Sequence, residues 1–301
     1  MNEMQERVLA LKKKKRALIL AHYYQTMDIH EIADHVCDSF EMARRAYEAD
    51  EELLIICGVQ FMAESAKILN PNKTVLLPSP DAGCPMADMI GPDDVLKLRL
   101  KYPDAAVVCY VNSSAAVKAV SDVCCTSSSA EKIVRALPER RVIFIPDRNL
   151  GAYIASKVPE KEVILYDGCC PAHDRITALD VANAKSAHPN AKLLAHPECR
   201  AEVLSQADYI GSTAGIIQEA SASNATEFII CTEAGVTDRL RANTAGKSFF
   251  PVVYDFICPD MKKTKLSDIL GSLENGDYEV MLSSSEIEAA SKSLARMVEL
   301  G

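Results

Sequence analysis

Three cysteines of this chain share a sequence context that favours metal binding. Each is followed by proline, and they lie 86 and 88 residues apart (170 − 84 and 258 − 170), at Cys84, Cys170 and Cys258. The even spacing indicates a triplicated chain in which each copy contributes one thiolate to a shared centre. Three thiolates leave one corner of a four-metal cluster without a protein ligand. Thiolates bind both zinc and iron–sulfur clusters, so the spacing alone leaves an iron–sulfur cluster, a zinc site or no metal open.

The other cysteines are better explained by packing than by disulfides. The chain has 11 cysteines in 301 residues, an odd number, and its charged N-terminus lacks an apolar signal segment. Cys169 is a rival ligand to Cys170; we favour Cys170 because proline follows it, as in the other two copies. Cys199 is expected to be structural or incidental. Five cysteines lie in apolar runs and are expected in the core: Cys57, Cys109, Cys124, Cys125 and Cys231.

The repeat is also visible without the cysteines. Three apolar, strand-like runs end at polar residues, and polar side chains recur at matched distances after them. The run ends are His22, Tyr110 and His196. Two positions on lie Tyr24, Asn112 and Glu198. Seventeen positions on lie Ser39, Ser127 and Thr213, each expected to open a helix. Asp147 and Glu233 share a further equivalent position, where interdomain polar contacts are expected.

Each copy contains four short apolar runs alternating with helical patterns. Such alternation is typical of parallel strands covered on both faces. We therefore expect an α/β protein of three pseudo-symmetric α/β/α sandwich domains, each with a small four-stranded parallel sheet, around a central active site. The expected domains are 1–90, 91–176 and 177–301. The third includes a C-terminal extension from about residue 264, whose helical pattern at 286–300 is expected to pack across another unit.

Composition limits the possible partners. The net charge of −9 argues against nucleic acid. No apolar stretch approaches the roughly 18 residues of a membrane span, and we expect a cytosolic protein. Ligands of open parallel sheets bind beyond the carboxyl ends of the strands, and helix N-termini attract carboxylate or phosphate. Three such edges facing one cavity would suit a small polyanionic substrate.

Several strings in the chain, taken together and in order, closely resemble the quinolinate synthase family over essentially the whole length. They are Ala21-His-Tyr-Tyr-Gln25, Asp38-Ser39, Cys109-Tyr-Val-Asn-Ser113, Cys125-Thr-Ser127, His196-Pro-Glu198, Gly211-Ser-Thr213 and Ile257-Cys-Pro-Asp-Met-Lys262. The family's three pseudo-symmetric domains agree with the repeat. The resemblance implies a [4Fe-4S] cluster held by Cys84, Cys170 and Cys258, with a fourth iron free to bind substrate.

The reaction implied by the resemblance condenses iminoaspartate (iminosuccinate) with dihydroxyacetone phosphate to quinolinate, phosphate and water, a step of NAD biosynthesis. It implies a functional link to an aspartate oxidase or dehydrogenase. Glu198 is our candidate base, with Tyr24, Tyr110 and His196 as further catalytic residues. His22 and His196 would orient anionic groups. His173 would lie beside the cluster or be a loop histidine. Carboxylates and phosphate would be held by Ser39, Asn112, Ser127 and Thr213.

Two other classes of function compete with this one. A different [4Fe-4S] hydro-lyase would also use an open iron, but the triplicated unit argues against the aconitase-like enzymes. A metal-dependent dicarboxylate sensor would need neither Tyr24, Tyr110 nor Glu198 beside the metal, and no output module is visible.

Overall fold

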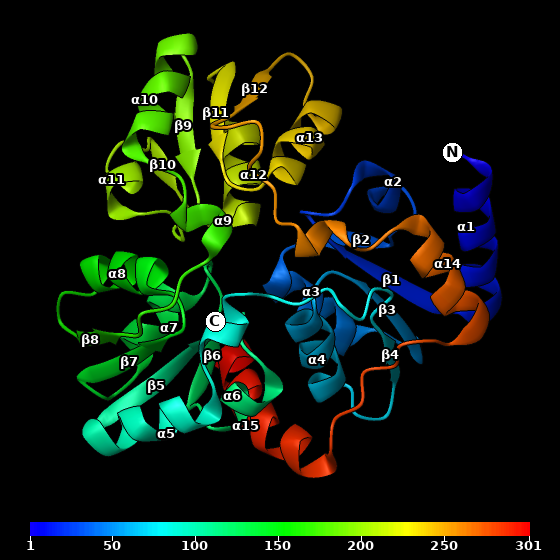
Figure 1. Cartoon of the computed structure of the whole chain (residues 1–301), viewed down its shortest axis with the longest axis horizontal. Coiled ribbons are helices and arrows are strands. Elements are labelled where there is room, and N and C mark those ends of the chain that lie inside the picture. The colour runs from blue at the N-terminus through cyan, green and yellow to red at the C-terminus, as the bar shows by residue number, and fades with distance from the viewer.

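The computed structural model describes residues 1–301 and contains three four-stranded sheets, each flanked by helices (Figure 1). All strand pairs are parallel, and the strand order is the same in each sheet: second, first, third, fourth. The first sheet holds β1 (Ala17–His22), β2 (His35–Cys37), β3 (Leu53–Cys57) and β4 (Thr74–Leu76). The second holds β5 (Ala105–Tyr110), β6 (Val123–Cys125), β7 (Arg141–Ile145) and β8 (Glu162–Leu165). The third holds β9 (Lys192–Ala195), β10 (Tyr209–Ile210), β11 (Glu227–Cys231) and β12 (Ser248–Pro251). The predicted α/β class and three-sheet architecture are confirmed.

Helices alternate with the strands throughout. The first unit carries α1 (Glu3–Lys15), α2 (Met27–His30), α3 (Ser39–Glu48) and α4 (Gln60–Leu69). The first unit ends with the 3-10 helix η1 (Ala87–Met89). The second carries α5 (Pro92–Lys101), α6 (Ala115–Ala119), α7 (Ala130–Ala136), α8 (Arg148–Lys157) and α9 (Pro171–Asp174). The third carries α10 (Ala178–Ala187), α11 (Ala201–Leu204), α12 (Thr213–Ala222), α13 (Ala234–Asn243) and the 3-10 helix η2 (Asp260–Lys262). No helix of the protein is both long enough and apolar enough to cross a membrane.

One hydrogen bond repeated in all three units shows that the copies match at atomic detail. An aspartate just before the second strand accepts the N–H of a residue fifteen positions earlier in the first strand. The pairs are Asp34 with Ile19 at 2.8 Å, Asp122 with Val107 at 2.7 Å and Asp208 with Leu193 at 2.8 Å. Each bond fixes the pairing register of the first two strands, and so aligns the residues that leave their carboxyl ends.

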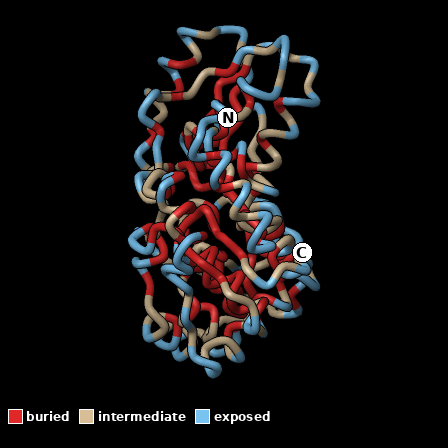
Figure 2. Tube along the Cα trace, turned by 90° about the vertical axis from the view of Figure 1, so that its right-hand side faces the viewer, coloured by how far each residue is buried: buried red, intermediate tan, exposed pale blue.

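The core joins the units. Every residue of β1 and β5 is buried, as expected for strands covered on both faces. The largest hydrophobic cluster, of 55 buried residues, includes side chains from all three units, so the units do not pack as independent bodies. Figure 2 shows the buried trace running through the interior and the exposed trace around it. The five cysteines expected in the core are buried.

The C-terminal segment crosses to the other two units. Helix α14 (Leu266–Asn275) packs against α1, and Leu76 of β4 pairs with Glu279. Helix α15 (Ser284–Leu300) packs against α6, β6 and α4 (Figure 1). The expectation that the extension packs across another unit is confirmed.

Two of the three predicted helix starts are confirmed, and the one at Ser127 is wrong. Ser127 does not open a helix, because α7 begins at Ala130 after a turn in which the Ser129 hydroxyl accepts the Thr126 N–H at 3.0 Å. Ser39 and Thr213 are the first residues of α3 and α12, but they do not cap them. The capping side chains belong to the preceding residues, Asp38 and Ser212. The hydroxyls of Ser39 and Thr213 are therefore not used as caps.

Candidate active site

A small cavity of about 70 Å³ lies where the carboxyl ends of the three sheets meet. The twelve residues predicted from the sequence for catalysis, substrate binding or metal binding all line it. From the first unit come His22, Tyr24, Ser39 and Cys84. From the second come Tyr110, Asn112, Ser127 and Cys170. From the third come His196, Glu198, Thr213 and Cys258. The matched offsets bring them together because equivalent strands end at equivalent levels around one centre.

Glu198 is the buried centre of the hydrogen bonding. Its Oε1 accepts the Tyr110 hydroxyl at 2.7 Å, and its Oε2 lies 2.8 Å from His173 Nδ1 and 3.6 Å from His196 Nδ1. Burial favours the protonated acid, but the contact with His173 and the hydrogen bonds from His173 and Tyr110 outweigh it and lower the pKa of Glu198. The carboxylate is therefore ionised at neutral pH and can accept a proton.

A chain of side chains connects Glu198 to Tyr24. His173 Nε2 lies 3.0 Å from the Thr232 hydroxyl, which lies 2.9 Å from the Tyr24 hydroxyl. The Tyr24 hydroxyl also lies 3.3 Å from that of Thr213. Burial, followed by the charge of Glu198, raises the pKa of Tyr24 well above its ordinary value, so the phenol holds its proton at rest.

Thr232 was missed in the sequence. It directly follows Cys231, the end of β11, so it lies one position beyond a residue that the repeat had already matched. Its equivalents are Gly58 and Pro146, which carry no hydrogen-bonding side chain. A search for polar residues shared by the copies therefore has no signal at this position. His173, by contrast, lines the cavity together with Cys170. This agrees with the prediction that it lies beside the metal site rather than in an unrelated loop.

His22 and His196 occupy equivalent positions and make equivalent bonds. Nδ1 of His22 accepts the Tyr24 N–H at 3.2 Å, and Nδ1 of His196 accepts the Glu198 N–H at 3.4 Å. Burial lowers the pKa of His22 to about 3 and that of His196 to about 4, so both rings are neutral. Because Nδ1 accepts, the single ring proton is on Nε2, which can donate. His196 Nε2 lies 3.2 Å from the Ser127 hydroxyl.

Asn112 presents an acceptor that the protein leaves unused. Its Oδ1 is buried beside the cavity and has no hydrogen-bond partner. Buried polar atoms are normally paired. The side chain is therefore positioned for a group that comes from a ligand.

The three Cys-Pro steps each lead into a short helix: η1 after Cys84, α9 after Cys170 and η2 after Cys258. Burial raises the pKa of all three thiols, to about 12 for Cys84, so a thiolate here needs a cation to compensate it. Three convergent thiols beside an unpaired amide oxygen fit a metal centre with three protein ligands. Cys169 does not line the cavity, and its N–H points to Met89 Sδ at 3.4 Å.

One other group of side chains is spaced closely enough to bind a metal ion. Ligand atoms of Cys170, His173 and Glu198 all lie within 4.8 Å of one another. We assign His173 and Glu198 to hydrogen bonding instead, because His173 Nδ1 and Glu198 Oε2 lie only 2.8 Å apart.

Asp147 and Glu233 do not make the interdomain contacts expected of them. Asp147 accepts the N–H groups of Leu150 and Cys170, both in its own unit. Glu233 likewise accepts the N–H of Cys258, and it pairs with Lys262 at 3.0 Å. Both are N-cap residues, and this is why their carboxylates turn back toward their own chain. Cys199, as expected, is buried and does not line the cavity.

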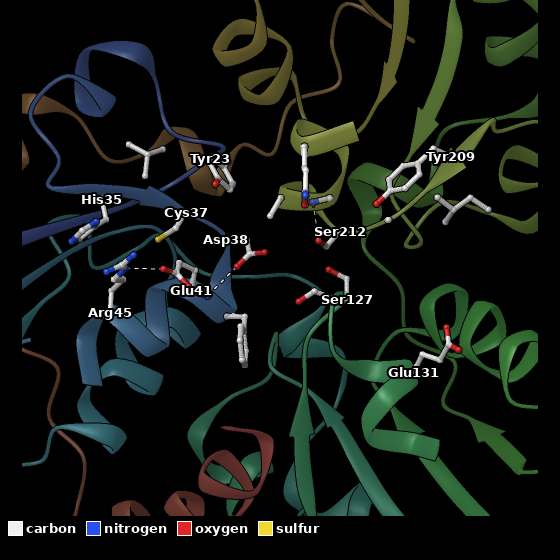
Figure 3. Close-up of a pocket in the computed structure, with 18 of the residues that line it drawn as sticks. Tyr23, His35, Cys37, Asp38, Glu41, Arg45, Ser127, Glu131, Tyr209 and Ser212 are labelled. Carbon is white, nitrogen blue, oxygen red and sulfur yellow. Dashed lines mark hydrogen bonds and ion pairs between the residues drawn. The ribbon is translucent and has the colours of Figure 1, made fainter. Parts of the chain in front are cut away.

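An outer cleft of about 800 Å³ adjoins the cavity and shares Asp38, Phe40 and Ser127 with it. Residues of β2 and β10 and the starts of α3 and α12 line this cleft. Figure 3 shows Asp38, Ser127 and Ser212 facing one another across it, from three different units. The cleft therefore gives the cavity a mouth at the junction of the units.

Comparisons with known proteins agree on one family. A family model described as quinolinate synthetase A protein matches residues 6–299. The chain is 51% identical over 290 residues to a quinolinate synthase of Caldicellulosiruptor saccharolyticus, covering 96% of each chain. It is 48% identical to a quinolinate synthase of Alkaliphilus metalliredigens, covering 100% of each. It is 47% identical to quinolinate synthase 2 of Methanosarcina acetivorans, covering 98% of this chain and 95% of the relative. The chain therefore belongs to the quinolinate synthetase A family.

Proposed function

We propose that this enzyme condenses iminoaspartate with dihydroxyacetone phosphate to give quinolinate, phosphate and water, the step that builds the pyridine ring of NAD. The names of its relatives support the product. The observation that carries the proposal is the hydrogen-bonded chain from Glu198 to Tyr24, which ends in the same cavity as the three Cys-Pro thiols. A condensation with dehydration needs acid and base groups beside a site that activates a leaving hydroxyl.

Cys84, Cys170 and Cys258 are the residues that would hold a [4Fe-4S] cluster. When bound, the cluster would supply a Lewis acid through the iron that has no protein ligand. The donor set fits this group, because three thiols from three units line one cavity and burial raises the pKa of each thiol, so a bound metal would compensate the thiolates.

The hydrogen-bonded chain gives the Tyr24 hydroxyl a route for its proton. His173 Nδ1–H donates to Glu198 Oε2, so His173 Nε2 is free to accept from the Thr232 hydroxyl. The Thr232 oxygen can then accept from the Tyr24 hydroxyl. When a substrate gives a proton to the Tyr24 oxygen, the original phenolic proton can pass along this chain to Glu198, so Tyr24 stays neutral.

Tyr110 contacts the same carboxylate on its other oxygen. Its hydroxyl donates to Glu198 Oε1 at 2.7 Å, and burial, together with the charge of Glu198, raises the pKa of this phenol well above its ordinary value. Tyr110 therefore begins as a proton donor, with Glu198 as the base that holds it in place.

Substrate anions are held by neutral donors in this proposal. The Nε2–H groups of His22 and His196 can donate to carboxylate or phosphate oxygens without carrying charge. Ser39 and Thr213 begin the ten-residue helices α3 and α12, whose N-termini favour negative charge. Ser127 and Asn112 complete the polar wall.

An anaerobic assay tests this function. The cluster is reconstituted, iminoaspartate is generated by an added aspartate oxidase or dehydrogenase, and dihydroxyacetone phosphate is supplied. We expect quinolinate and phosphate in equal amounts, with no product when either substrate is omitted. A protein with a full cluster that forms no quinolinate would contradict the proposal. If that protein dehydrates another hydroxy acid, the result would support a hydro-lyase. If it binds a dicarboxylate tightly without turnover, the result would support a sensor.

A further inference from the structure

The three loops that carry the Cys-Pro steps are anchored by the same backbone hydrogen bond. In each unit, the first residue of the helix after the third strand donates its N–H to the carbonyl two positions before the cysteine. The bonds are Gln60 to Ala82, Arg148 to Gly168 and Ala234 to Phe256, each 2.8 Å long. The helices are α4, α8 and α13. This anchor is common to all three loops and does not distinguish them.

A second anchor is present in only two of the loops. The residue just before each helix is Val59, Asp147 and Glu233 in turn. Asp147 caps α8 through Oδ1, which accepts the Leu150 N–H at 2.7 Å, while its Oδ2 accepts the Cys170 N–H at 3.0 Å. Glu233 caps α13 through Oε2, at 2.7 Å from the Gly235 nitrogen, and its Oε1 accepts the Cys258 N–H at 3.4 Å.

The first unit has no counterpart. Val59 caps α4 without any side-chain hydrogen bond, so the Cys84 N–H meets no carboxylate. Gly83 precedes Cys84, and a side chain added at Gly83 would meet nothing within 4 Å. The Cys84 loop therefore has the backbone anchor but lacks the carboxylate bond that the other two loops have.

We propose that Asp147 and Glu233 are positioning residues that fix the main chain of Cys170 and Cys258 for the metal centre, while the Cys84 loop lacks such a residue. This inference rests on the proposed function, because it assumes that these cysteines are the ligands. Each carboxylate acts through a backbone N–H and touches no ligand sulfur in the described contacts.

Electrostatics alone would not favour these carboxylates. Asp147 disfavours the thiolate of Cys170, and Glu233 disfavours that of Cys258, because like charges repel. Glu233 is compensated by Lys262, whose ammonium lies 3.0 Å away and also contacts the Tyr24 carbonyl. Asp147 is fully buried and has no such cation within ion-pair distance. What Asp147 contributes is geometry: one side chain joins the start of α8 to the ligand loop.

Three substitutions of Asp147 separate its hydrogen bond to the Cys170 N–H from its role as the cap of α8. Asn is as good an N-cap as Asp, so Asp147→Asn keeps the stronger bond to Leu150 and turns its amide N–H₂ toward the Cys170 N–H. Asp147→Ala loses both bonds. Asp147→Glu keeps a carboxylate, as Glu233 does at the equivalent position of the third unit.

The first measurement is the rate at which reconstituted protein loses iron to a chelator under anaerobic conditions, followed by absorbance. We expect a rise of about tenfold or more for Asp147→Asn and Asp147→Ala, the scale typical of groups that orient metal ligands, and a rate near wild type for Asp147→Glu. A rate for Asp147→Asn equal to wild type would show that only the helix cap matters, and would overturn the inference.

The second measurement needs no metal and no activity. In the metal-free protein, hydrogen exchange at the Cys170 amide should quicken in Asp147→Asn but not in Asp147→Glu. In the wild type, the Cys84 amide should exchange faster than that of Cys170. Equal rates at both amides would contradict the asymmetry. Failure of the proposed function would look different: the wild-type protein would hold no cluster or form no quinolinate, whatever residue stands at 147.

Discussion

The Tyr110 hydroxyl donates a 2.7 Å hydrogen bond to Glu198, although the two residues come from different units and lie 88 positions apart. The bond crosses the same cavity in which Glu198 also meets His173 at 2.8 Å. Glu198 thus connects two tyrosines, Tyr110 directly and Tyr24 through His173 and Thr232. A single carboxylate beyond the end of one strand therefore connects side chains from all three units.

Replacing Glu198 with Gln should remove the base and keep the shape of the site. The amide oxygen can still accept the Tyr110 hydroxyl, but it cannot take up a proton near neutral pH. We expect kcat for quinolinate formation to fall by about 100-fold or more, the usual scale for a general base. Iron content and melting temperature should be close to wild type. A Glu198→Gln enzyme with a full cluster and a near-normal rate would exclude the base role.

Thr232 is expected to act only through its hydroxyl. Thr232→Val keeps the shape and breaks the link between Tyr24 and His173, so kcat should fall by roughly 100-fold, while Thr232→Ser should recover most of it. Thr237→Val is the matched control. Thr237 is buried on α13 in the same unit, but its hydroxyl has no partner, so its loss should be neutral or slightly stabilising. Equal rates for Thr232→Val and Thr232→Ser would contradict the relay.

The sequence predicts the sheets well and the side-chain partnerships poorly, for a physical reason. Strand ends follow from apolar periodicity, and equivalent strands end at one edge, so matched spacing was enough to gather the residues that line the cavity. The partner of each side chain depends on rotamers and on how the units face each other. Nothing local in the sequence pairs His173 with Thr232, 59 positions away.

The caps show the same limit on a smaller scale. Ser39 and Thr213 open their helices as the sequence predicts, but the caps are Asp38 and Ser212. Ser127 lies three positions before α7 because the Thr126–Ser129 turn closes on itself first. Element boundaries are set by which polar atom reaches a free N–H, and short polar clusters offer several candidates.

Iron content should distinguish the two adjacent cysteines. Cys170 lines the cavity, whereas Cys169 lies outside its lining and turns its N–H toward Met89. We expect Cys169→Ser to bind iron and sulfide like the wild type after reconstitution. Cys170→Ser should lose most of the cluster absorbance, as should the serine variants of Cys84 and Cys258. Loss of iron only in Cys169→Ser would reverse the assignment.

Lys118 should be essential for stability rather than chemistry. It is fully buried, and its ammonium donates to the carbonyls of Ser113 and Phe61 and to the Ser65 hydroxyl, joining α6 to α4 of the first unit. Lys118→Met leaves these acceptors unsatisfied, which should cost about 2–4 kcal/mol of unfolding free energy. The exposed Lys132, changed to Met in the same unit, should cost less than about 0.5 kcal/mol. Denaturant unfolding of both variants measures the difference. Equal midpoints would show that the buried hydrogen bonds of Lys118 do not stabilise the fold.

Buried histidines should make the fold sensitive to acid. Burial lowers the pKa of His30 to about 4. The contact between its Nε2 and the His22 carbonyl, at 3.3 Å, favours the charged ring but is too weak to offset burial. Between pH 6.5 and 4 the unfolded chain therefore binds a proton at this residue that the folded protein does not. Stability contributed by neutral His30 is present above pH 6.5 and is lost as the pH falls toward 4.

His30→Gln removes this titration and should flatten the dependence of unfolding free energy on pH. The difference between variant and wild type should change by up to about 3 kcal/mol across this window, since one pKa unit corresponds to about 1.4 kcal/mol. His22 and His196 still titrate in the variant and leave a residual slope. Denaturant unfolding of both metal-free proteins at several pH values makes the comparison. Parallel curves between pH 6.5 and 4 would show that His30 takes up its proton equally in the folded and unfolded states.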